Sequence, residues 1–213
     1  APSDLDPTFG NAGKVIWSPN NNTTSRAGTA MALQANGKIV MTGGFSETSG
    51  VTDFMAVRFN ASGSLDTTFG TAAVVIITFG GAVEAANSVD IQPDGKIVVG
   101  GRTSFSGVSY EFAVARLNTD GSLDTTFSGD GKVTVGFTVN GSQMPDEMNA
   151  LRVMPSGKIV VAGVTGGGSD HDFAIIRLLP SGSLDATFGA GGKVITDFSG
   201  RNEGYAVFGI VIE

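Results

Sequence analysis

Acidic side chains are the groups in this sequence whose type and spacing could do chemistry. Asp53, Glu111 and Asp172 each stand just before an apolar segment, at intervals of about sixty residues. If these segments end at one face of the molecule, the acids could ring an opening and bind a cation or a sugar. A pair of them could also act as acid and nucleophile on a glycoside. The simpler interpretation, which we favour, is that each acid is solvated, holds its loop, or pairs with an arginine nearby in sequence. The arginines in question are Arg58, Arg116 and Arg177.

A second candidate is the only histidine, His171, which lies in the sequence Ser169-Asp-His-Asp172. A histidine between two aspartates could contact a ligand, although a polar loop more often exposes it to solvent. No Gly-x-Ser-x-Gly motif is present to supply a serine nucleophile for a catalytic triad. The absence of cysteine excludes thiolate catalysis and cysteine-based zinc sites. We therefore predict no catalytic residue, and we take Asp53, Glu111, His171 and Asp172 as candidate ligand contacts.

Four further aspartates share one motif, in which each follows a leucine and precedes x-Thr-Phe. They are Asp6, Asp66, Asp124 and Asp185. An aspartate in this setting most simply accepts backbone N–H bonds in a turn. Four equivalent catalytic acids would be difficult to explain, because acid and base need differently tuned environments.

Calcium is a weaker interpretation of one of these motifs. The stretch Asn118-Thr-Asp-Gly-Ser-Leu-Asp124 places oxygen groups at alternate positions, as short calcium loops do, which makes Asp120 and Asp124 candidate ligands. The matching stretches of the other copies lack the middle aspartate, and no glutamate follows at position twelve of such a loop. A plain Asp-Gly turn is the preferred interpretation.

The Leu-Asp motif recurs with a period of about sixty residues, which implies that one supersecondary unit is repeated along the chain. We expect a single repeat domain covering residues 1–213. Its units are approximately 5–64, 65–122, 123–183 and a partial 184–213. A phenylalanine ends each copy of the motif, and we expect these side chains to pack between neighbouring units. They are Phe9, Phe69, Phe127 and Phe188.

Each complete unit contains four short apolar segments rich in valine and isoleucine, separated by Gly, Asn, Asp or Ser. This is the signature of strands and turns. Asn-Gly or Asp-Gly pairs, as in Pro93-Asp-Gly95, tolerate the positive φ of tight hairpin turns. No apolar pattern with the helical period of about 3.6 is sustained. The sequence therefore predicts an all-β fold, a β-propeller-like array of four-stranded antiparallel blades, with about three and a half blades in the chain.

Three motifs recur in register: Leu-Asp-x-Thr-Phe, Gln-Pro-Asp-Gly-Lys-Ile-Val-Val and Phe-Ala-Val-Ala-Arg-Leu-Asn-x-Asp-Gly. Together they resemble the bacterial delta-60 repeat family. The resemblance covers nearly the whole chain and implies propeller-like blades in a secreted or cell-surface protein. It implies no particular reaction.

Composition restricts the partners. The formal net charge is −7, and the thirteen basic residues are dispersed, which argues against a nucleic-acid surface. No apolar run approaches the roughly 18 residues of a membrane helix, so we expect no membrane insertion. The small residues Ala1-Pro-Ser suit cleavage of a secretory leader. We therefore expect a secreted or cell-surface protein of bacterial type.

The last segment, Tyr205–Glu213, is apolar, yet the hairpin that follows the matching segments of the other units does not follow it. An uncovered strand edge is normally paired, so we expect self-association through this segment or a longer parent chain. The expected function is a secreted, non-enzymatic structural or recognition scaffold for a carbohydrate or a cell-surface partner. Its contacts would lie in the variable loops Gly43–Asp53, Gly100–Glu111 and Gly163–Asp172. The alternative is a glycoside-acting enzyme, or a lectin that binds a sugar or a cation through the loop carboxylates.

Overall fold

The computed structural model describes residues 5–18, 25–46, 50–105, 109–139, 142–167, 170–197 and 209–211. These residues form fourteen β-strands and no helix, so no membrane-spanning helix occurs among them. The first eight strands are β1 (Ser25–Leu33), β2 (Ile39–Ser46), β3 (Thr52–Phe59), β4 (Val74–Ile77), β5 (Val83–Ile91), β6 (Ile97–Ser104), β7 (Glu111–Leu117) and β8 (Lys132–Val135). The remaining six are β9 (Thr138–Val139), β10 (Ser142–Gln143), β11 (Asp146–Val153), β12 (Ile159–Gly167), β13 (Asp170–Leu178) and β14 (Lys193–Thr196).

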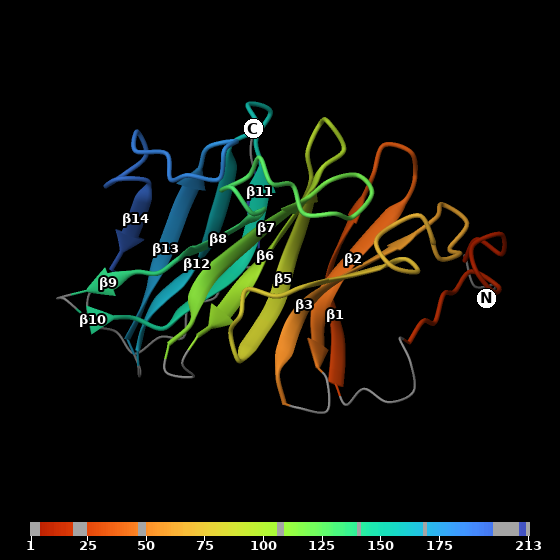
Figure 1. The fold of residues 1–213 in the computed structure, drawn as a ribbon, viewed down its shortest axis with the longest axis horizontal. Helices are drawn as coiled ribbons and strands as arrows, with labels where there is room; N and C mark the ends of the chain where they lie inside the picture. Colours follow the sequence, from red (N-terminus) through yellow and green to blue (C-terminus); the bar gives the residue numbers. More distant parts are fainter. Residues whose placement is uncertain are drawn as a thin grey trace.

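The strands form three four-stranded antiparallel blades: β1–β4, β5–β8 and β11–β14. A single parallel bridge between Thr52 and Val83 links the first two blades. The short strands β9 and β10 pair with each other between β8 and β11. Figure 1 shows the blades side by side, from β1–β3 on the right to β12–β14 on the left. The predicted all-β, β-propeller-like array of antiparallel blades is confirmed.

Tight turns join the first two strands of each blade. The glycine at each turn adopts a left-handed conformation, with φ of 79° at Gly37, 85° at Gly95 and 78° at Gly157. Residues with a Cβ rarely adopt this conformation, so the Asn-Gly, Asp-Gly and Ser-Gly pairs fix the hairpins. Figure 1 shows these three turns along the upper edge of the molecule.

The blades are offset from the sequence repeats. Each fourth strand follows the next copy of the Leu-Asp motif but pairs with the third strand before that motif, as Ile77 does with Phe54. The motif itself therefore forms the loop between the third and fourth strands of one blade. The segment Val74–Ile77 begins the second sequence unit, yet it completes the first blade.

The cores lie between adjacent blades rather than within one. One cluster joins Phe54 and Phe69 of the first blade to Ile97 of the second, and another joins Phe127 of the second blade to Ile176 of the third. Phe69 and Phe127 are fully buried, as expected for side chains that pack between units. The phenylalanines of the first and last motifs, Phe9 and Phe188, are only half-buried.

Candidate functional site

The aspartates of the three complete motifs lie at the centre of identical charged clusters. Asp66 Oδ2 accepts hydrogen bonds from Arg58 Nε at 2.6 Å and from Lys38 Nζ at 2.8 Å. Its other oxygen, Oδ1, accepts bonds from the backbone N and the Oγ1 of Thr68. We call this arrangement the Asp–Lys–Arg network. The other two copies consist of Asp124 with Lys96, Arg116 and Thr126, and of Asp185 with Lys158, Arg177 and Thr187.

Electrostatics fix these aspartates in the ionised form. Burial disfavours the charge of Asp66 and Asp124, but the bonds from lysine, threonine and arginine outweigh it and hold the pKa of both carboxyls well below the usual range. The bonds from Lys158 and Thr187 likewise lower the pKa of Asp185. A carboxylate held this firmly as an anion cannot serve as a general acid near neutral pH.

The arginine of the network also connects neighbouring blades. Arg58 stacks over Phe69, with 4.4 Å from its guanidinium carbon to the ring centroid, and its Nη1 donates to the carbonyl of Thr119 in the second blade. In the next copy, Arg116 Nη1 donates to the carbonyl of Pro180 in the third blade at 2.6 Å. The repeated charged residues therefore build the blades and their interfaces.

The network also bears on calcium. Both carboxylate oxygens of Asp124 already accept hydrogen bonds, and two of the donors are cations. Asp120 Oδ1 accepts bonds from the backbone N and the hydroxyl of Ser122, which lower the pKa of Asp120. Among the residues that the structure describes, no three His, Cys, Asp or Glu side chains gather as a metal-ligand group. Calcium binding at Asp120 and Asp124 stays a prediction that the geometry does not favour.

The loop acids occupy one position in all three blades, at the start of the third strand. Asp53 pairs in register with Phe45, Glu111 with Thr103, and Asp172 with Thr165. These positions lie at the end of the blades opposite the hairpin turns, and all three side chains are half-buried.

Their local contacts differ from blade to blade. Glu111 Oε1 accepts a hydrogen bond from Gln143 Nε2 at 2.6 Å. His171 is half-buried and adjoins Asp172 on β13, opposite Gly166. The structure thus places the sequence-predicted candidates at one end of the blades, each in its own blade apart from the neighbours His171 and Asp172.

Two buried acids escaped the sequence analysis. Glu84 and Asp146 lie near the starts of β5 and β11, and neither side chain is exposed to solvent. Glu84 accepts bonds from the backbone N of Phe79 and of Gly81, and Asp146 Oδ2 accepts one from the backbone N of Phe137 at 2.8 Å. Each acid holds the loop that leads from the fourth strand of one blade to the first strand of the next.

The environment of these two acids favours their neutral forms. Burial raises the pKa of Glu84, and it raises the pKa of Asp146 to about 6. The charge of Asp53 adds to the effect at Glu84, and the charge of Glu111 adds to it at Asp146. A sequence signal for them existed, namely one acid near the start of each of these two strands. The equivalence of the two acids is hard to see in the sequence because the loops before them differ in length. Glu84 follows Phe79 by five residues, whereas Asp146 follows Phe137 by nine.

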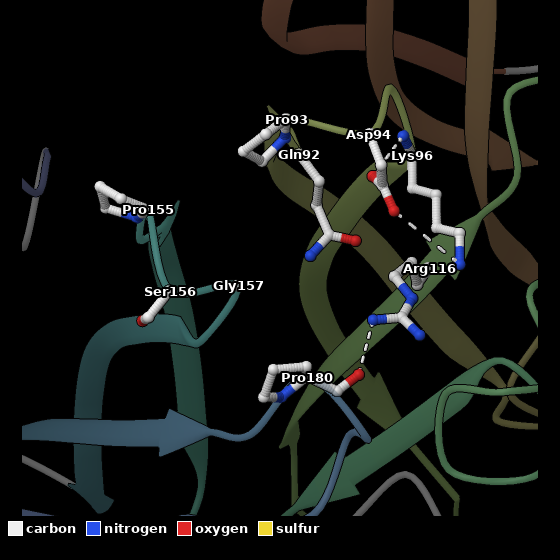
Figure 2. A pocket seen from close by; sticks show the side chains of 9 residues that line it. All are labelled: Gln92, Pro93, Asp94, Lys96, Arg116, Pro155, Ser156, Gly157 and Pro180. Carbon is white, nitrogen blue, oxygen red and sulfur yellow. Dashed lines mark hydrogen bonds and ion pairs between the residues drawn. The ribbon is translucent and has the colours of Figure 1, made fainter.

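A shallow groove of about 390 Å³ lies at the hairpin-turn end, between the second and third blades. Its lining residues are Gln92, Pro93, Asp94, Lys96, Arg116, Pro155, Ser156, Gly157 and Pro180. Figure 2 shows Lys96 directed toward Asp94 and Arg116 directed toward the carbonyl of Pro180. Both cations also bind Asp124, so their charges are already compensated. The groove contains one carboxylate, Asp94, and therefore lacks the pair that glycoside hydrolysis requires.

Comparison with known proteins identifies the repeat. The model of a family described as a β-propeller domain of unknown function, DUF5122, matches residues 34–69, 92–127 and 155–188. No curated protein matches the chain. Each matched stretch begins at a hairpin turn and ends at the phenylalanine of the next motif. It therefore contains one complete Asp–Lys–Arg network. Three consecutive repeats of the chain therefore match this β-propeller family, in agreement with the resemblance to the delta-60 repeat.

Proposed function

We propose that this protein is a non-enzymatic β-propeller scaffold that acts outside the cell and contacts a ligand through the loop end of its blades. The observation that carries the proposal is the Asp–Lys–Arg network. Its charged residues recur in every complete repeat, yet their polar atoms bind one another and, in the first two blades, a carbonyl of the following blade. Groups used in this way stabilise a framework, so recognition falls to residues outside the network, in and beside the variable loops.

The enzyme alternative has less support from the geometry. Among the described carboxyl groups, Glu84 and Asp146 have a raised pKa, as a general acid requires. Both are fully buried and hold loop backbone, so neither can reach a glycosidic oxygen. A glycosidase would have to use Asp53, Glu111 or Asp172 instead.

Those three acids and His171 are the ligand contacts that we propose. Their carboxylates can accept hydrogen bonds from hydroxyl groups, and the imidazole can donate or accept one. Because the three acids occupy one register position in successive blades, a ligand that extends across blades could meet more than one of them. A hydroxyl-rich ligand such as a glycan on a cell surface fits this chemistry. The dispersed basic residues offer little to a polyanion.

A glycan array with the wild-type protein tests the proposal, followed by the variants Asp53→Asn, Glu111→Gln, Asp172→Asn and His171→Ala. Asp94→Asn is a matched control, because Asp94 is an exposed acid at the opposite, hairpin-turn end. We expect a glycan to bind the wild type and the control, and binding to weaken in at least one loop variant. Absence of binding, or equal binding by all variants, would exclude this loop-end role. If the wild-type protein hydrolyses a member of a glycoside panel and Glu111→Gln abolishes that hydrolysis, the protein is a glycosidase instead.

A further inference from the structure

The N-terminal segment, residues 5–17, has the same relation to the first blade that residues 65–77 have to the second. Gly10 N donates to the carbonyl of Ser62 in the first blade at 2.8 Å, and Gly70 N donates to that of Asp120 in the second blade at the same distance. The motif turn is also the same, because Asp6 Oδ1 accepts bonds from the backbone N and the hydroxyl of Thr8. The segment is thus the outer loop and fourth strand of a blade that would stand ahead of the first.

Asp6 lacks the cations that bind its equivalents. In the three complete networks, a lysine from the start of the second strand and an arginine from the third strand share one aspartate oxygen. Within the described part of the chain, no lysine or arginine contacts Asp6, whose lowered pKa stems from Thr8. Asp6 is exposed, whereas Asp66, Asp124 and Asp185 are buried.

The strand that follows Asp6 lacks its partner as well. Residues 14–17 match β4, which pairs with β3, but they form only a bridge at Lys14 with the preceding turn. Ile16 is 95% exposed, compared with 42% for the equivalent Ile76. Trp17 contacts Phe59 edge-to-face, with 6.3 Å between ring centroids. The side of this segment turned away from the first blade is where a third strand would pair.

The first blade also exposes an apolar face, whereas the equivalent face is buried in the second and third blades. Met31 and Leu33 of β1 are 64% and 70% exposed. Val89 of β5 and Leu151 of β11, which match Met31, are 7% and 4% exposed and belong to the inter-blade clusters. In the second and third blades this face packs against the preceding blade. The same kind of sheet would cover it in the first.

We propose that residues 5–17 and the exposed face of β1 form a docking site for the first three strands of a further copy of this repeat. The added strands would pair with Lys14–Trp17, and their lysine and arginine would bind Asp6 as Lys38 and Arg58 bind Asp66. The preceding blade completed in this way would bury Met31 and Leu33. This inference concerns assembly of the framework and stands apart from the ligand contacts at the loop end.

Trp17, the only tryptophan, reports on the site. In the 213-residue chain, called the unextended chain below, we expect iodide to quench its fluorescence. The test chain carries a copy of residues 79–122, which contains three strands and no tryptophan, fused directly ahead of Leu5 so that the Ser122–Leu123 register is kept. We expect a severalfold lower quenching constant, a blue-shifted emission and a single unfolding transition at a higher temperature. A second chain with a copy of residues 142–183 fused at the same point guards against misfolding of one extension.

Matched variants separate specific docking from mere crowding of Trp17. Lys96→Met with Arg116→Met, made in the added copy only, should restore part of the quenching and lower the melting temperature. Asp6→Asn should do the same in the extended chain and leave the unextended chain unchanged. If both extended chains leave Trp17 as accessible as in the unextended chain, the proposed docking site is wrong. Equal effects of Asp6→Asn in the unextended and extended chains would also overturn it.

Discussion

Aspartate serves two opposite electrostatic purposes in this molecule. Asp124 is buried but accepts bonds from two cations and from the backbone N and the hydroxyl of Thr126, which hold it ionised. Asp146 is equally buried, but its Oδ2 accepts one backbone N–H, and its Oδ1 has no hydrogen-bond partner among the described residues. The local donors, and not burial alone, decide which protonation state the fold favours. This difference predicts opposite responses to pH.

Asp146 should weaken the fold as the pH rises. Its pKa is about 6 in the folded protein, compared with the ordinary value of 3.8 in the unfolded chain, so folding takes up a proton between these values. Its contribution is therefore favourable at low pH and is lost as the pH rises through about 4 to 6, by ~3 kcal/mol. Asp146→Asn keeps an oxygen for Phe137 N–H and removes this penalty. We expect urea unfolding of the variant to show a smaller loss of stability over that range, and parallel curves for the two proteins would contradict the assignment.

Asp124 should act in the reverse direction. A lowered pKa stabilises the fold at pH values above the unfolded value of 3.8, and this contribution is lost as the pH falls toward the folded value. Asp124→Asn leaves Lys96 and Arg116 without their anion, which for a largely buried pair costs on the order of 3 kcal/mol. The exposed Asp6 supplies the control, since Asp6→Asn should change the free energy of unfolding at pH 7 by much less. Equal losses in the two variants would show that the network adds little.

At the scale of the strands, most of the local structure could be predicted from the sequence. Alternation, β-branched residues and Asn-Gly or Asp-Gly turns predicted the strands and the hairpins, because these signals act between near neighbours. The assignment of β4 to the blade of β3 could not be predicted, since a period fixes spacing but does not tell on which side a segment pairs. Glu84 and Asp146 were missed because the loops before them differ in length, and β9 and β10 lie in the longer of those loops.

The motif phenylalanine predicts a difference between internal and terminal copies. Phe127 is fully buried in the cluster between the second and third blades, whereas Phe9 is half-buried. Truncation of a buried phenylalanine to alanine typically costs ~3–5 kcal/mol. We therefore expect Phe127→Ala to lower the free energy of unfolding far more than Phe9→Ala, as measured by chemical denaturation. Small and equal losses would show that the ring does not hold the blades together.

For the whole molecule, the blades interact mainly with their sequence neighbours, through an apolar cluster and an arginine that reaches forward. The last of these arginines differs from the others. The side chain of Arg177 is 21% exposed, compared with 6% for Arg58 and Arg116, which donate to a carbonyl of the following blade. No such carbonyl acceptor contacts Arg177 in the described part of the chain. Among the described residues, the forward face of the third blade therefore presents the donor of an inter-blade contact without its acceptor.

The final prediction concerns the segment Tyr205–Glu213, for which we propose self-association or pairing within a longer chain. Most of it lies outside the described residues. Of the described part, the carbonyl of Ile210 accepts a bond from Arg152 Nε at 3.4 Å, and Val211 is 88% exposed. A strand edge that is left uncovered offers its backbone groups to a second copy. We expect a concentration-dependent rise in mass by analytical ultracentrifugation, which both deletion of 205–213 and Val211→Asp should reduce. Because Val211 is exposed, Val211→Asp should leave the monomer's melting temperature unchanged, so a loss of assembly would not reflect unfolding. A monomer that persists at high concentration would show that this segment does not mediate self-association.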